Sequence, residues 1–324
     1  MKKMLGICAV NEALSEEMQR DENVIIIGED VGIYSGGCGA TKGLVEKYGK
    51  ERVIETPISE TAFTGMAVGA AMMGLRPVVE IMFADFTSLA LDPIINHAAK
   101  LPFMSGGRLQ VPMVLRTPIC YGTGAAAQHS QSVESLFLNT PGIKVVAPSC
   151  SADLKGLLKS AIRDDAPVIF LEHKLLNKCE MPLPEGEYTI PLGKADIKRE
   201  GKDISIISYS NSVNICLKAA SMLAAEDIDA EVVDVRTLRP FDKETVIASV
   251  MKTKRAIIVH AAPAFGGFGG EIISEIMESD VFGMLKAPIK RVCGIEMPMP
   301  YTKTLEDLTV PSAENIIKAV KEII

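Results

Sequence analysis

The sequence contains no tryptophan, and its other aromatic residues are few. In 324 residues, aromatic side chains make up 5%, and 34 Lys and Arg stand against 41 Asp and Glu, which gives a net charge of −7. Binding to nucleic acid relies on an excess of basic residues for the phosphates and, for single strands, on aromatic rings that stack with the bases. We therefore expect a protein that does not bind nucleic acid.

Pairs of cysteine at metal-binding spacing are also missing. The seven cysteines are scattered without a Cys-x-x-Cys pair, and the four histidines lie far apart in the sequence. Neither a zinc site nor a redox dithiol is indicated. The longest apolar stretch without charge, residues 61–75, falls short of the roughly 20 residues that cross a bilayer. Unpaired thiols and the lack of a membrane span lead us to expect a cytoplasmic protein.

Motifs of several large enzyme classes are absent as well. The sequence has no GxxxxGK[ST], HExxH or GxSxG motif, so it does not resemble the enzymes that these motifs mark. Glycine-rich stretches at residues 36–41, 122–127 and 266–270 do not follow the dinucleotide-binding pattern of a strand, GxGxxG and a later acidic residue. An NAD-binding oxidoreductase is therefore not indicated.

Short apolar runs alternate with helical patterns in the first part of the chain. The runs show little period-two alternation, which is typical of parallel strands covered on both faces. The sequence therefore predicts an α/β protein with a doubly wound parallel sheet. Predicted strands lie at residues 24–27, 53–55, 78–83, 111–116, 144–147 and 168–171, and predicted helices at 9–20, 61–73, 88–100, 131–138 and 151–163.

A second α/β unit follows a polar stretch. Residues 179–203 carry three Pro, three Gly and many charges, which predicts a linker that includes one short strand. Strand and helix patterns then resume, with Asp242 as the predicted N-cap of one helix and a last helix that starts at Ser312. We predict a first domain at residues 1–185, a linker at 186–203 and a second domain at 204–324.

Polar and aromatic residues follow several predicted strands, at the edge where open α/β sheets bind ligands. Glu60 stands in a turn that leads into an apolar Gly/Ala helix, where a carboxylate would be poorly solvated. The same position also suits an acidic residue that simply interacts with the helix dipole. His129 could transfer protons or be a hydrogen-bonded structural residue, and Phe86 could be a stacking face or part of the core.

Eight strings, in order along nearly the whole chain, resemble one family. They are similar to the beta subunit of the dehydrogenase component of thiamine-diphosphate-dependent 2-oxo acid dehydrogenase complexes, such as the pyruvate, branched-chain 2-oxo acid and acetoin enzymes. The resemblance implies a transketolase-like pyrimidine-binding domain followed by a transketolase C-terminal α/β domain. The strings are GEDVG (28–32), TPISE (56–60), GLRPVVEIMFADF (74–86), AAKLPFMSGG (98–107), AAAQHSQS around His129, PGIKVVAPS (141–149), AIRDDAPVIFLEHK (161–174) and DVRTLRPFD (234–242).

The resemblance also carries expectations about cofactors and partners. Family members bind the diphosphate through Mg²⁺ and a GDG motif, which this sequence lacks. In the split members that motif lies on the alpha subunit, so thiamine diphosphate would be shared between the chains and Mg²⁺ would be held by the alpha subunit. The resemblance further implies a heterotetramer of two alpha and two beta chains, docked through the second domain to the lipoyl acyltransferase core of a multienzyme complex.

The resemblance assigns roles to individual residues by their positions in the matching strings. Glu60 matches the activating glutamate that hydrogen-bonds to the aminopyrimidine, Phe86 matches the aromatic that stacks on that ring, and Ile58 is expected to contact the cofactor. His129 matches the histidine that assists proton transfer or reductive acylation of a lipoyl group. A structural potassium ion is implied at the backbone carbonyls of Met113, Ala161, Ile162, Asp164 and Ala166.

The implied reaction is oxidative decarboxylation of a 2-oxo acid with reductive acylation of a lipoyl group, and pyruvate is the leading substrate. The strings TPICYGTGAAAQHSQ (117–131) and YTIPLGKADIKREG (188–201) resemble acetoin dehydrogenase beta subunits, whereas MSGG (104–107) resembles pyruvate dehydrogenase. Thiamine-dependent cleavage of acetoin is therefore an alternative. A non-catalytic beta-like scaffold is a remote alternative, because such a protein would be expected to lose Glu60 or His129, and both are present.

Overall fold

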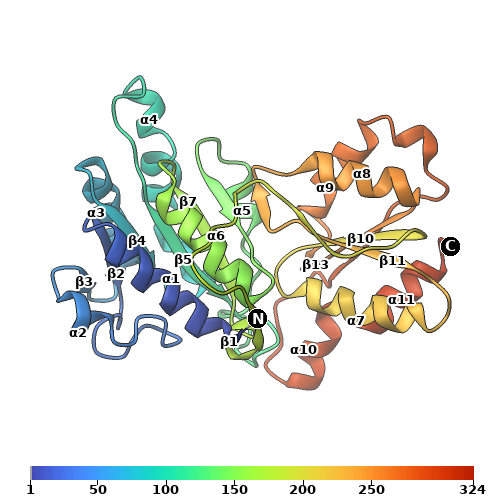
Figure 1. Cartoon of the computed structure of the whole chain (residues 1–324), viewed down its shortest axis with the longest axis horizontal. Coiled ribbons are helices and arrows are strands. Elements are labelled where there is room, and N and C mark those ends of the chain that lie inside the picture. The colour runs from blue at the N-terminus through green and yellow to red at the C-terminus, as the bar shows by residue number, and fades with distance from the viewer. Residues whose placement is uncertain (1) are drawn as a thin grey trace.

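A seven-stranded sheet forms the centre of the first half of the molecule in the computed structural model, which describes residues 2–324 (Figure 1). The strand order is β12-β6-β7-β5-β4-β2-β3, and all neighbours pair in parallel except β12 and β6. The strands are β2 (Val24–Gly28), β3 (Val53–Glu55), β4 (Arg76–Glu80), β5 (Val114–Ile119), β6 (Lys144–Val146), β7 (Val168–His173) and β12 (Thr237–Arg239). The helices of this half are α1 (Gly6–Arg20), α2 (Leu44–Tyr48), α3 (Glu60–Met72), η1 (Ala84–Ala90), η2 (Pro93–Ala98), α4 (Leu101–Met104), α5 (Ser135–Leu138), α6 (Ser151–Arg163) and η3 (Leu176–Lys178).

Both faces of this sheet are covered by helices. Successive residues of a strand face opposite sides, and Ile25 and Ile27 of β2 are buried in one core cluster together with residues of α3 and η1. Val24 and Ile26 are buried on the other side, together with residues of α1 and α6. This two-sided burial explains why the strands read as continuous apolar runs, and the predicted doubly wound parallel sheet is confirmed.

A five-stranded sheet with the order β14-β13-β10-β11-β9 forms the second half, and only β9 runs antiparallel to its neighbour. Helices α7 and α11 cover one face, and α8 and α9 cover the other (Figure 1). The strands are β9 (Asp196–Arg199), β10 (Ile204–Ser208), β11 (Ala230–Asp234), β13 (Ala256–Pro263) and β14 (Lys290–Gly294). The helices are α7 (Ser212–Ala224), α8 (Lys243–Thr253), α9 (Gly269–Met277), η4 (Phe282–Met284), α10 (Lys303–Thr309) and α11 (Ala313–Lys321).

Two predicted helix starts are confirmed by their capping contacts. The Asp242 carboxylate accepts a hydrogen bond from the backbone N–H of Thr245 at the start of α8. At the start of α11, Ser312 and Asn315 form a reciprocal capping box, in which each side chain accepts from the other's backbone N–H. Such caps satisfy N–H groups that have no partner within the helix, so the local sequence alone defines both starts.

The structure differs from the sequence prediction at several places, of which three bear on the site or on the pairing of the sheets. The helix predicted at residues 88–100 is split into the 3₁₀-helix η1 and the π-helix η2, because Pro93 has no N–H with which to continue a helix. The helix predicted at 131–138 is only α5, since Gln131 is held in a loop by Asp85. A further sheet pairs β1 (Lys2–Leu5) with β8 (Glu180–Leu183). Strand β1 was not predicted, and residues 179–203, for which one short strand was predicted, contain both β8 and β9.

The predicted linker contains β9, which is the short strand expected there, and β12 returns from the second half to pair with β6. The addition of β12 to the first sheet joins the two halves by backbone hydrogen bonds. The domain limits of 1–185, 186–203 and 204–324 stay a prediction. No helix within residues 2–324 has the length and apolar character of a bilayer-crossing segment, and the cytoplasmic location also stays a prediction.

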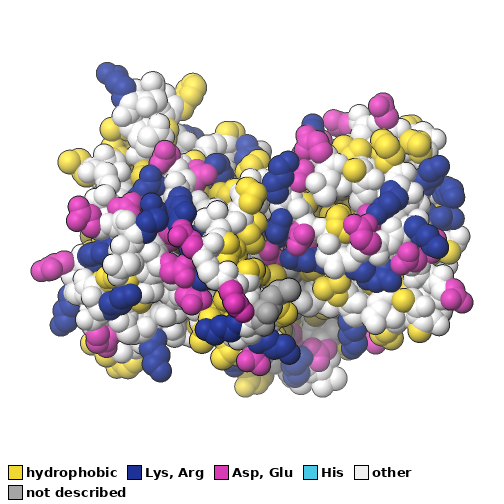
Figure 2. Space-filling view, in the orientation of Figure 1, with side chains coloured by type: hydrophobic (Ala, Val, Ile, Leu, Met, Phe, Trp, Pro, Cys, Tyr) yellow, Lys and Arg dark blue, Asp and Glu magenta, His cyan; other side chains and the backbone are white. Residues whose placement is uncertain are grey.

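Lys and Arg side chains lie among Asp and Glu on the face drawn in Figure 2. Where α1 and α6 cross, Lys155 and Lys159 each contact Glu16, at 2.6 and 2.5 Å, and Arg163 contacts Glu17 at 2.7 Å. These pairs join two helices that also share apolar residues in the core. Charges of both signs are therefore interspersed on this face, and the pairs between α1 and α6 link the two helices.

Candidate active site

Four neighbouring strands end at one edge of the first sheet, and the segments after them carry the candidate residues. The order β3-β2-β4-β5 places these strand ends side by side. Glu60 follows β3, Glu29 follows β2, Phe86 follows β4, and the loop that contains His129 follows β5. Parallel pairing thus brings residues that are distant in sequence to the edge at which open α/β sheets bind ligands.

Glu60 is the first residue of α3, and only 6% of its surface is exposed. A carboxylate at this position interacts favourably with the helix dipole. It is also close enough to affect Glu29, because the pKa of Glu29 is raised by burial and, in addition, by the negative charges of Glu60 and Asp30. The Thr61 hydroxyl donates to the carbonyl of Leu89 and ties the start of α3 to η1. Glu60 therefore has the poorly solvated surroundings that the sequence predicts.

Phe83, Phe86 and His129 form a cluster of three rings. The imidazole centre of His129 lies 4.6 Å from the ring centre of Phe83 and 5.3 Å from that of Phe86, in both cases edge to face. The two phenyl rings are 5.9 Å apart, also edge to face. Edge-to-face contacts of this kind are favourable and fix ring orientation, so the strand ends of β4 and β5 hold the imidazole between two aromatic surfaces.

The segment that follows His129 is fastened to the segment that carries Phe86. One carboxylate oxygen of Asp85 accepts hydrogen bonds from the backbone N–H of Gln131 at 3.1 Å and from its side-chain amide at 2.9 Å. The backbone N–H of His129 donates to the carbonyl of Ala126 at 3.3 Å. The sequence indicates Asp85 as a polar residue that follows a predicted strand, but its function as an anchor for this loop becomes visible only in the structure.

A cavity of about 530 Å³ opens beside the imidazole of His129. The ammonium group of Lys174, just after β7, lies 4.7 Å from the ring centre of Phe83, at a distance typical of a cation–π contact. Lys178 also lines this cavity. The imidazole of His129 and the two ammonium groups would together favour an anionic or carbonyl-bearing ligand. The lining residues are Phe83, Thr123, Ala125, His129, Lys174, Leu175 and Lys178.

A buried ion triad joins the three strands β4, β5 and β7 of this sheet. The guanidinium of Arg116 in β5 contacts the carboxylates of Glu80 in β4 and Glu172 in β7, and all three residues are buried. Although burial alone would lower the pKa of Arg116, the charges of Glu172 and Glu80 raise it, so the guanidinium stays charged. Glu80 also accepts from the N–H of Gly37 at 2.8 Å. This triad was not predicted from the sequence, although Arg116 is a charged residue within the apolar run VLRTPI.

Several polar atoms at the same edge have no partner within the protein. Among residues 2–324, the buried atoms without a hydrogen-bond partner include Oε1 of Glu29, Oγ1 of Thr56, Oδ2 of Asp85 and Oγ of Ser130. Buried polar groups in native proteins are nearly always hydrogen-bonded. The concentration of such atoms around the strand ends therefore fits a polar ligand bound at this edge.

Ile58 is separated from this group of residues. Its side chain lies in the turn between β3 and α3 and is 81% exposed. The structure thus brings Phe86 and His129 into contact and places Glu60 beside Glu29, whereas the side chain of Ile58 is largely exposed to solvent. An exposed isoleucine two residues from a buried carboxylate is a surface that another molecule could cover.

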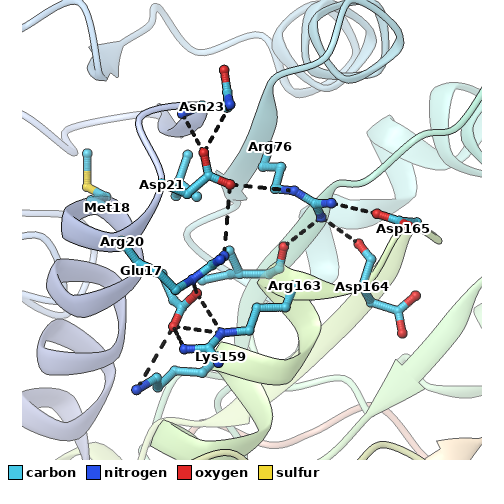
Figure 3. A network of polar contacts seen from close by, with 12 residues as sticks. Glu17, Met18, Arg20, Asp21, Asn23, Arg76, Lys159, Arg163, Asp164 and Asp165 are labelled. Atoms are coloured by element: carbon cyan, nitrogen blue, oxygen red, sulfur yellow. Dashed lines mark hydrogen bonds and ion pairs between the residues drawn. The ribbon is translucent and has the colours of Figure 1, made fainter. Parts of the chain in front are cut away.

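Two of the five carbonyls expected to hold potassium lie next to Arg76 (Figure 3). The carbonyl oxygens of Ile162 and Asp164 both accept from Nη1 of Arg76, at 3.1 and 3.0 Å. The positively charged guanidinium of Arg76 therefore already uses one lone pair of each of these two oxygens, and the potassium site stays a prediction. Ala161 and Met113 use their carbonyls for backbone hydrogen bonds. No cluster of three or more His, Cys, Asp or Glu that could hold a metal ion occurs in the described part of the chain.

Comparison with protein families divides the chain into two matching parts. Residues 2–178 match the model of the transketolase pyrimidine binding domain. Residues 193–316 match the model of the transketolase C-terminal domain. The first match includes all residues of the edge described above, and the second includes the whole of the five-stranded sheet. The fold expected from the resemblance is therefore confirmed.

Relatives with high similarity span nearly the full chain. The pyruvate dehydrogenase E1 component subunit beta of Caenorhabditis elegans is 47% identical over 97% of this chain and 90% of its own length. The subunit of the same name from Homo sapiens is 46% identical over 97% of this chain and 89% of its own length. Subunit beta-1 from Arabidopsis thaliana is 46% identical over 99% of this chain. All three names describe the relatives as mitochondrial.

A solved structure with low sequence identity has the same fold. It is described as a split gene transketolase, inactive beta4 tetramer, and it superposes with a TM-score of 0.82 over 99% of this chain and 98% of its own. The sequences are 21% identical, so this similarity concerns the architecture alone.

Proposed function

The chain belongs to the family of the pyruvate dehydrogenase E1 beta subunits, and from this membership we propose that it is the beta subunit of a thiamine-diphosphate-dependent 2-oxo acid dehydrogenase. The proposed activity is oxidative decarboxylation of pyruvate with reductive acylation of a lipoyl group, which makes it an oxidoreductase with a disulfide acceptor. The observation that carries this proposal is the edge at which a buried Glu60 and the contacting rings of Phe86 and His129 lie at neighbouring strand ends.

The residues at this edge fit the pyrimidine half of thiamine diphosphate. When bound, this cofactor supplies the nucleophilic carbon and the electron sink for cleavage of a bond next to a carbonyl. Phe86 offers a flat apolar surface for the pyrimidine ring. The unpartnered oxygens of Glu29 and Asp85 offer hydrogen-bond acceptors for amino groups. A ring with both an apolar face and polar edges therefore matches what this part of the chain provides.

Glu60 would control the protonation of the bound pyrimidine. Its carboxyl group is withdrawn from water at the start of α3, where a hydrogen bond to a ring nitrogen is stronger than it would be in bulk solvent. A carboxyl group held there can keep a proton on that nitrogen. Ile58, in the turn just before Glu60, would contribute an apolar contact once a second chain covers it.

His129 would handle protons on the substrate side of the site. Its imidazole lines the cavity of about 530 Å³ and is oriented by the edges of Phe83 and Phe86. Imidazole donates and accepts protons readily, which is the property needed when an acyl group passes to a lipoyl sulfur. Lys174 and Lys178 at the same cavity would attract the carboxylate of a 2-oxo acid.

An alpha subunit would complete the site. The sequence has no GDG motif to hold a Mg²⁺-bound diphosphate, so we place the diphosphate and Mg²⁺ on an alpha chain in an assembly of two alpha and two beta chains. Large apolar side chains of the first half are exposed and available for such a partner: Ile33 (77%), Tyr34 (72%), Ile58 (81%), Met73 (85%) and Phe103 (89%). Of these, Ile33, Tyr34 and Ile58 lie in the segments that follow β2 and β3, at the edge of the site. Surface patches of this kind mark sites of protein association.

The named relatives favour pyruvate over acetoin as the substrate, because all three are pyruvate dehydrogenase subunits. The scaffold alternative is disfavoured, because Glu60 and His129 are retained and placed at one edge. To test the proposal, the chain is produced alone and together with its alpha subunit, and binding of thiamine diphosphate is measured by calorimetry. We expect tight binding only by the complex, and turnover with pyruvate but not with acetoin or branched-chain 2-oxo acids. Tight binding by the lone chain would contradict the shared site.

Docking to an acyltransferase core has its own test. We propose that the second half binds the lipoyl acyltransferase core, because that half lies outside the sheet that bears the site (Figure 1). The complex with the alpha subunit is mixed with the core and analysed by size-exclusion chromatography. Co-elution is expected, and separate elution at micromolar concentrations would argue against docking.

A further inference from the structure

Helix α10 is held to the rest of the molecule by a carboxylate. In α10 only Glu306 and Thr309 are buried, while Leu305 and Leu308 are 52% and 68% exposed. A surface helix normally buries its apolar residues. Here the apolar side chains lie outside, and the residue directed at the protein is a fully buried acid. A buried carboxylate requires hydrogen-bond donors or a cation as partners.

The partner is the backbone of the loop that leads to His129. One oxygen of the Glu306 carboxylate accepts from the N–H of Gly122 at 2.7 Å, and the other accepts from the N–H of Gly124 at 3.0 Å. Both glycines have positive φ angles, of 80° and 73°, in the left-handed region that favours glycine. The loop thus adopts a conformation that turns two N–H groups towards one carboxylate, as in the nests that bind anions.

Glu306 is itself fixed to the second half of the molecule. Its backbone N–H donates to the carbonyl of Thr302 at 2.9 Å, and its carbonyl accepts from the hydroxyl of Thr309 at 2.7 Å. The carbonyl of Thr309 accepts from the N–H of Ile295, just after β14. The carboxylate is therefore a rigid projection of the second half that reaches into the first.

Two carboxylates from different halves hold the loop at its two ends. Glu306 holds Gly122 and Gly124, and Asp85 holds Gln131. His129 lies between these two attachment points, and the same stretch supplies part of the cavity lining. A glycine-containing loop has a large conformational entropy when it is free, so its order depends on these attachments.

We propose that Glu306 is a positioning residue, which orders the loop of residues 122–131 and thereby places His129 for its reaction. The carboxylate lies on the other half of the molecule and acts only through the backbone of the loop. The inference deepens the proposed function, because the importance of an ordered His129 rests on that function. It also gives α10 a function, to carry the carboxylate that holds this loop, which the sequence of the helix does not indicate.

The test uses the complex with the alpha subunit and three variants. In Glu306→Gln, the amide can accept from one glycine N–H but opposes the other with its own N–H₂, whereas Glu306→Asp keeps both oxygens at a shorter reach. Asp307→Asn is the matched control, because Asp307 is the next residue on α10 and its exposed side chain forms an ion pair with Lys303, not with the loop. Hydrogen–deuterium exchange of peptides covering residues 120–131 reports loop order without any requirement for activity.

We expect at least tenfold faster exchange in residues 120–131 for Glu306→Gln, an intermediate rate for Glu306→Asp, and no change for Asp307→Asn. Reductive acylation of a free lipoyl domain should fall at least tenfold in kcat in Glu306→Gln, with the KM for pyruvate within about twofold of the unmodified enzyme. Combination with His129→Gln should add no further loss, because the two residues serve one step. Rescue by Glu306→Asp distinguishes positioning from general damage to the fold.

Two results would overturn the proposal. One is unchanged exchange of residues 120–131 in Glu306→Gln, and the other is a full additive loss when this variant is combined with His129→Gln. If the unmodified complex has no activity on any 2-oxo acid and Glu306→Gln still loosens the loop, the proposed function fails while the attachment of the loop by Glu306 stands.

Discussion

The imidazole of His129 and the phenyl ring of Phe86 meet edge to face, with their centres 5.3 Å apart. They come from the ends of two neighbouring parallel strands, β4 and β5. If Phe86 packs on the cofactor ring, this contact couples the position of the cofactor to that of the proton-transferring group. A single aromatic contact thus links the cofactor-binding part of the site to its substrate side.

Replacement of Glu60 by Gln should abolish turnover without disturbing assembly. A Gln side chain fills the same space at the start of α3 but cannot exchange a proton, and loss of a general acid–base group typically costs about 10²–10⁴ in rate. Steady-state turnover of pyruvate and analytical ultracentrifugation of the complex check both parts of this expectation. Glu51→Gln, at an exposed position, is the control and should retain full activity. A Glu60→Gln enzyme with near-normal turnover would remove Glu60 from its proposed role.

Replacement of Arg116 by Met should destabilise the protein strongly. The variant leaves the buried carboxylates of Glu80 and Glu172 next to each other without their common cation. Removal of one partner from a buried ion cluster typically costs about 3–5 kcal/mol. Chemical denaturation of the lone chain measures the loss, and Arg108→Met, at an exposed position, should change stability by less than about 0.5 kcal/mol. Equal stability of the two variants would show that the triad contributes little.

Much of the framework could be predicted from local patterns. The apolar run of β2, the Gly/Ala helix α3 and the N-cap Asp242 each depend on residues close in sequence, and all were predicted. Glu60 could be singled out because a strand, a turn and an apolar helix follow one another directly. Its burial then follows from the local chain direction.

Contacts between distant residues could not be predicted in the same way. Glu306 lies in a polar stretch with no apolar periodicity, and its partners Gly122 and Gly124 are more than 180 residues away. The pairing of β12 with β6 likewise joins residues of the two halves. No local periodicity reports such a pairing, because the energy that selects it comes from packing of the completed halves. The site residues Glu60, Phe86 and His129 were therefore predicted, whereas Arg116 and Glu306, which are buried and support the site, were not.

Potassium should stabilise the protein more than sodium does, if the carbonyls around Arg76 bind a cation. At a potassium concentration of ten times the dissociation constant, binding contributes about 1.4 kcal/mol, which corresponds to a rise in Tm of roughly 2–4 °C for a chain of this size. Thermal unfolding is followed in potassium, sodium and choline chloride at equal ionic strength. The ligands are backbone carbonyls, so comparison of ions replaces mutation as the control. Equal Tm values in the three salts would contradict a selective site.

The contribution of Asp234, at the interface of the two halves, to the stability of the chain should fall as the pH rises from about 4 to about 7. Burial raises the pKa of Asp234 to about 7, with a further contribution from the charge of Asp153. The native state therefore keeps this proton up to neutral pH, whereas the unfolded chain releases it near its ordinary value of about 3.9. Stability decreases with pH wherever the native state binds more protons than the unfolded state, and this contribution is lost between those two pKa values.

Replacement of Asp234 by Asn should remove this pH dependence. The amide can still accept from the N–H of Arg236 and can donate to the hydroxyl oxygen of Ser149, whose present partner is the Asp234 carboxylate. The Tm of Asp234→Asn relative to the unmodified chain should therefore increase from pH 5 to pH 7 and stay constant above pH 8. Asp227→Asn is a suitable control, because Asp227 is exposed and its positive φ of 60° is tolerated by Asn. A difference in Tm that is the same at pH 5 and pH 8 would show that Asp234 is ionised in the native state throughout, and that Lys198, at 3.5 Å, outweighs the cost of burial.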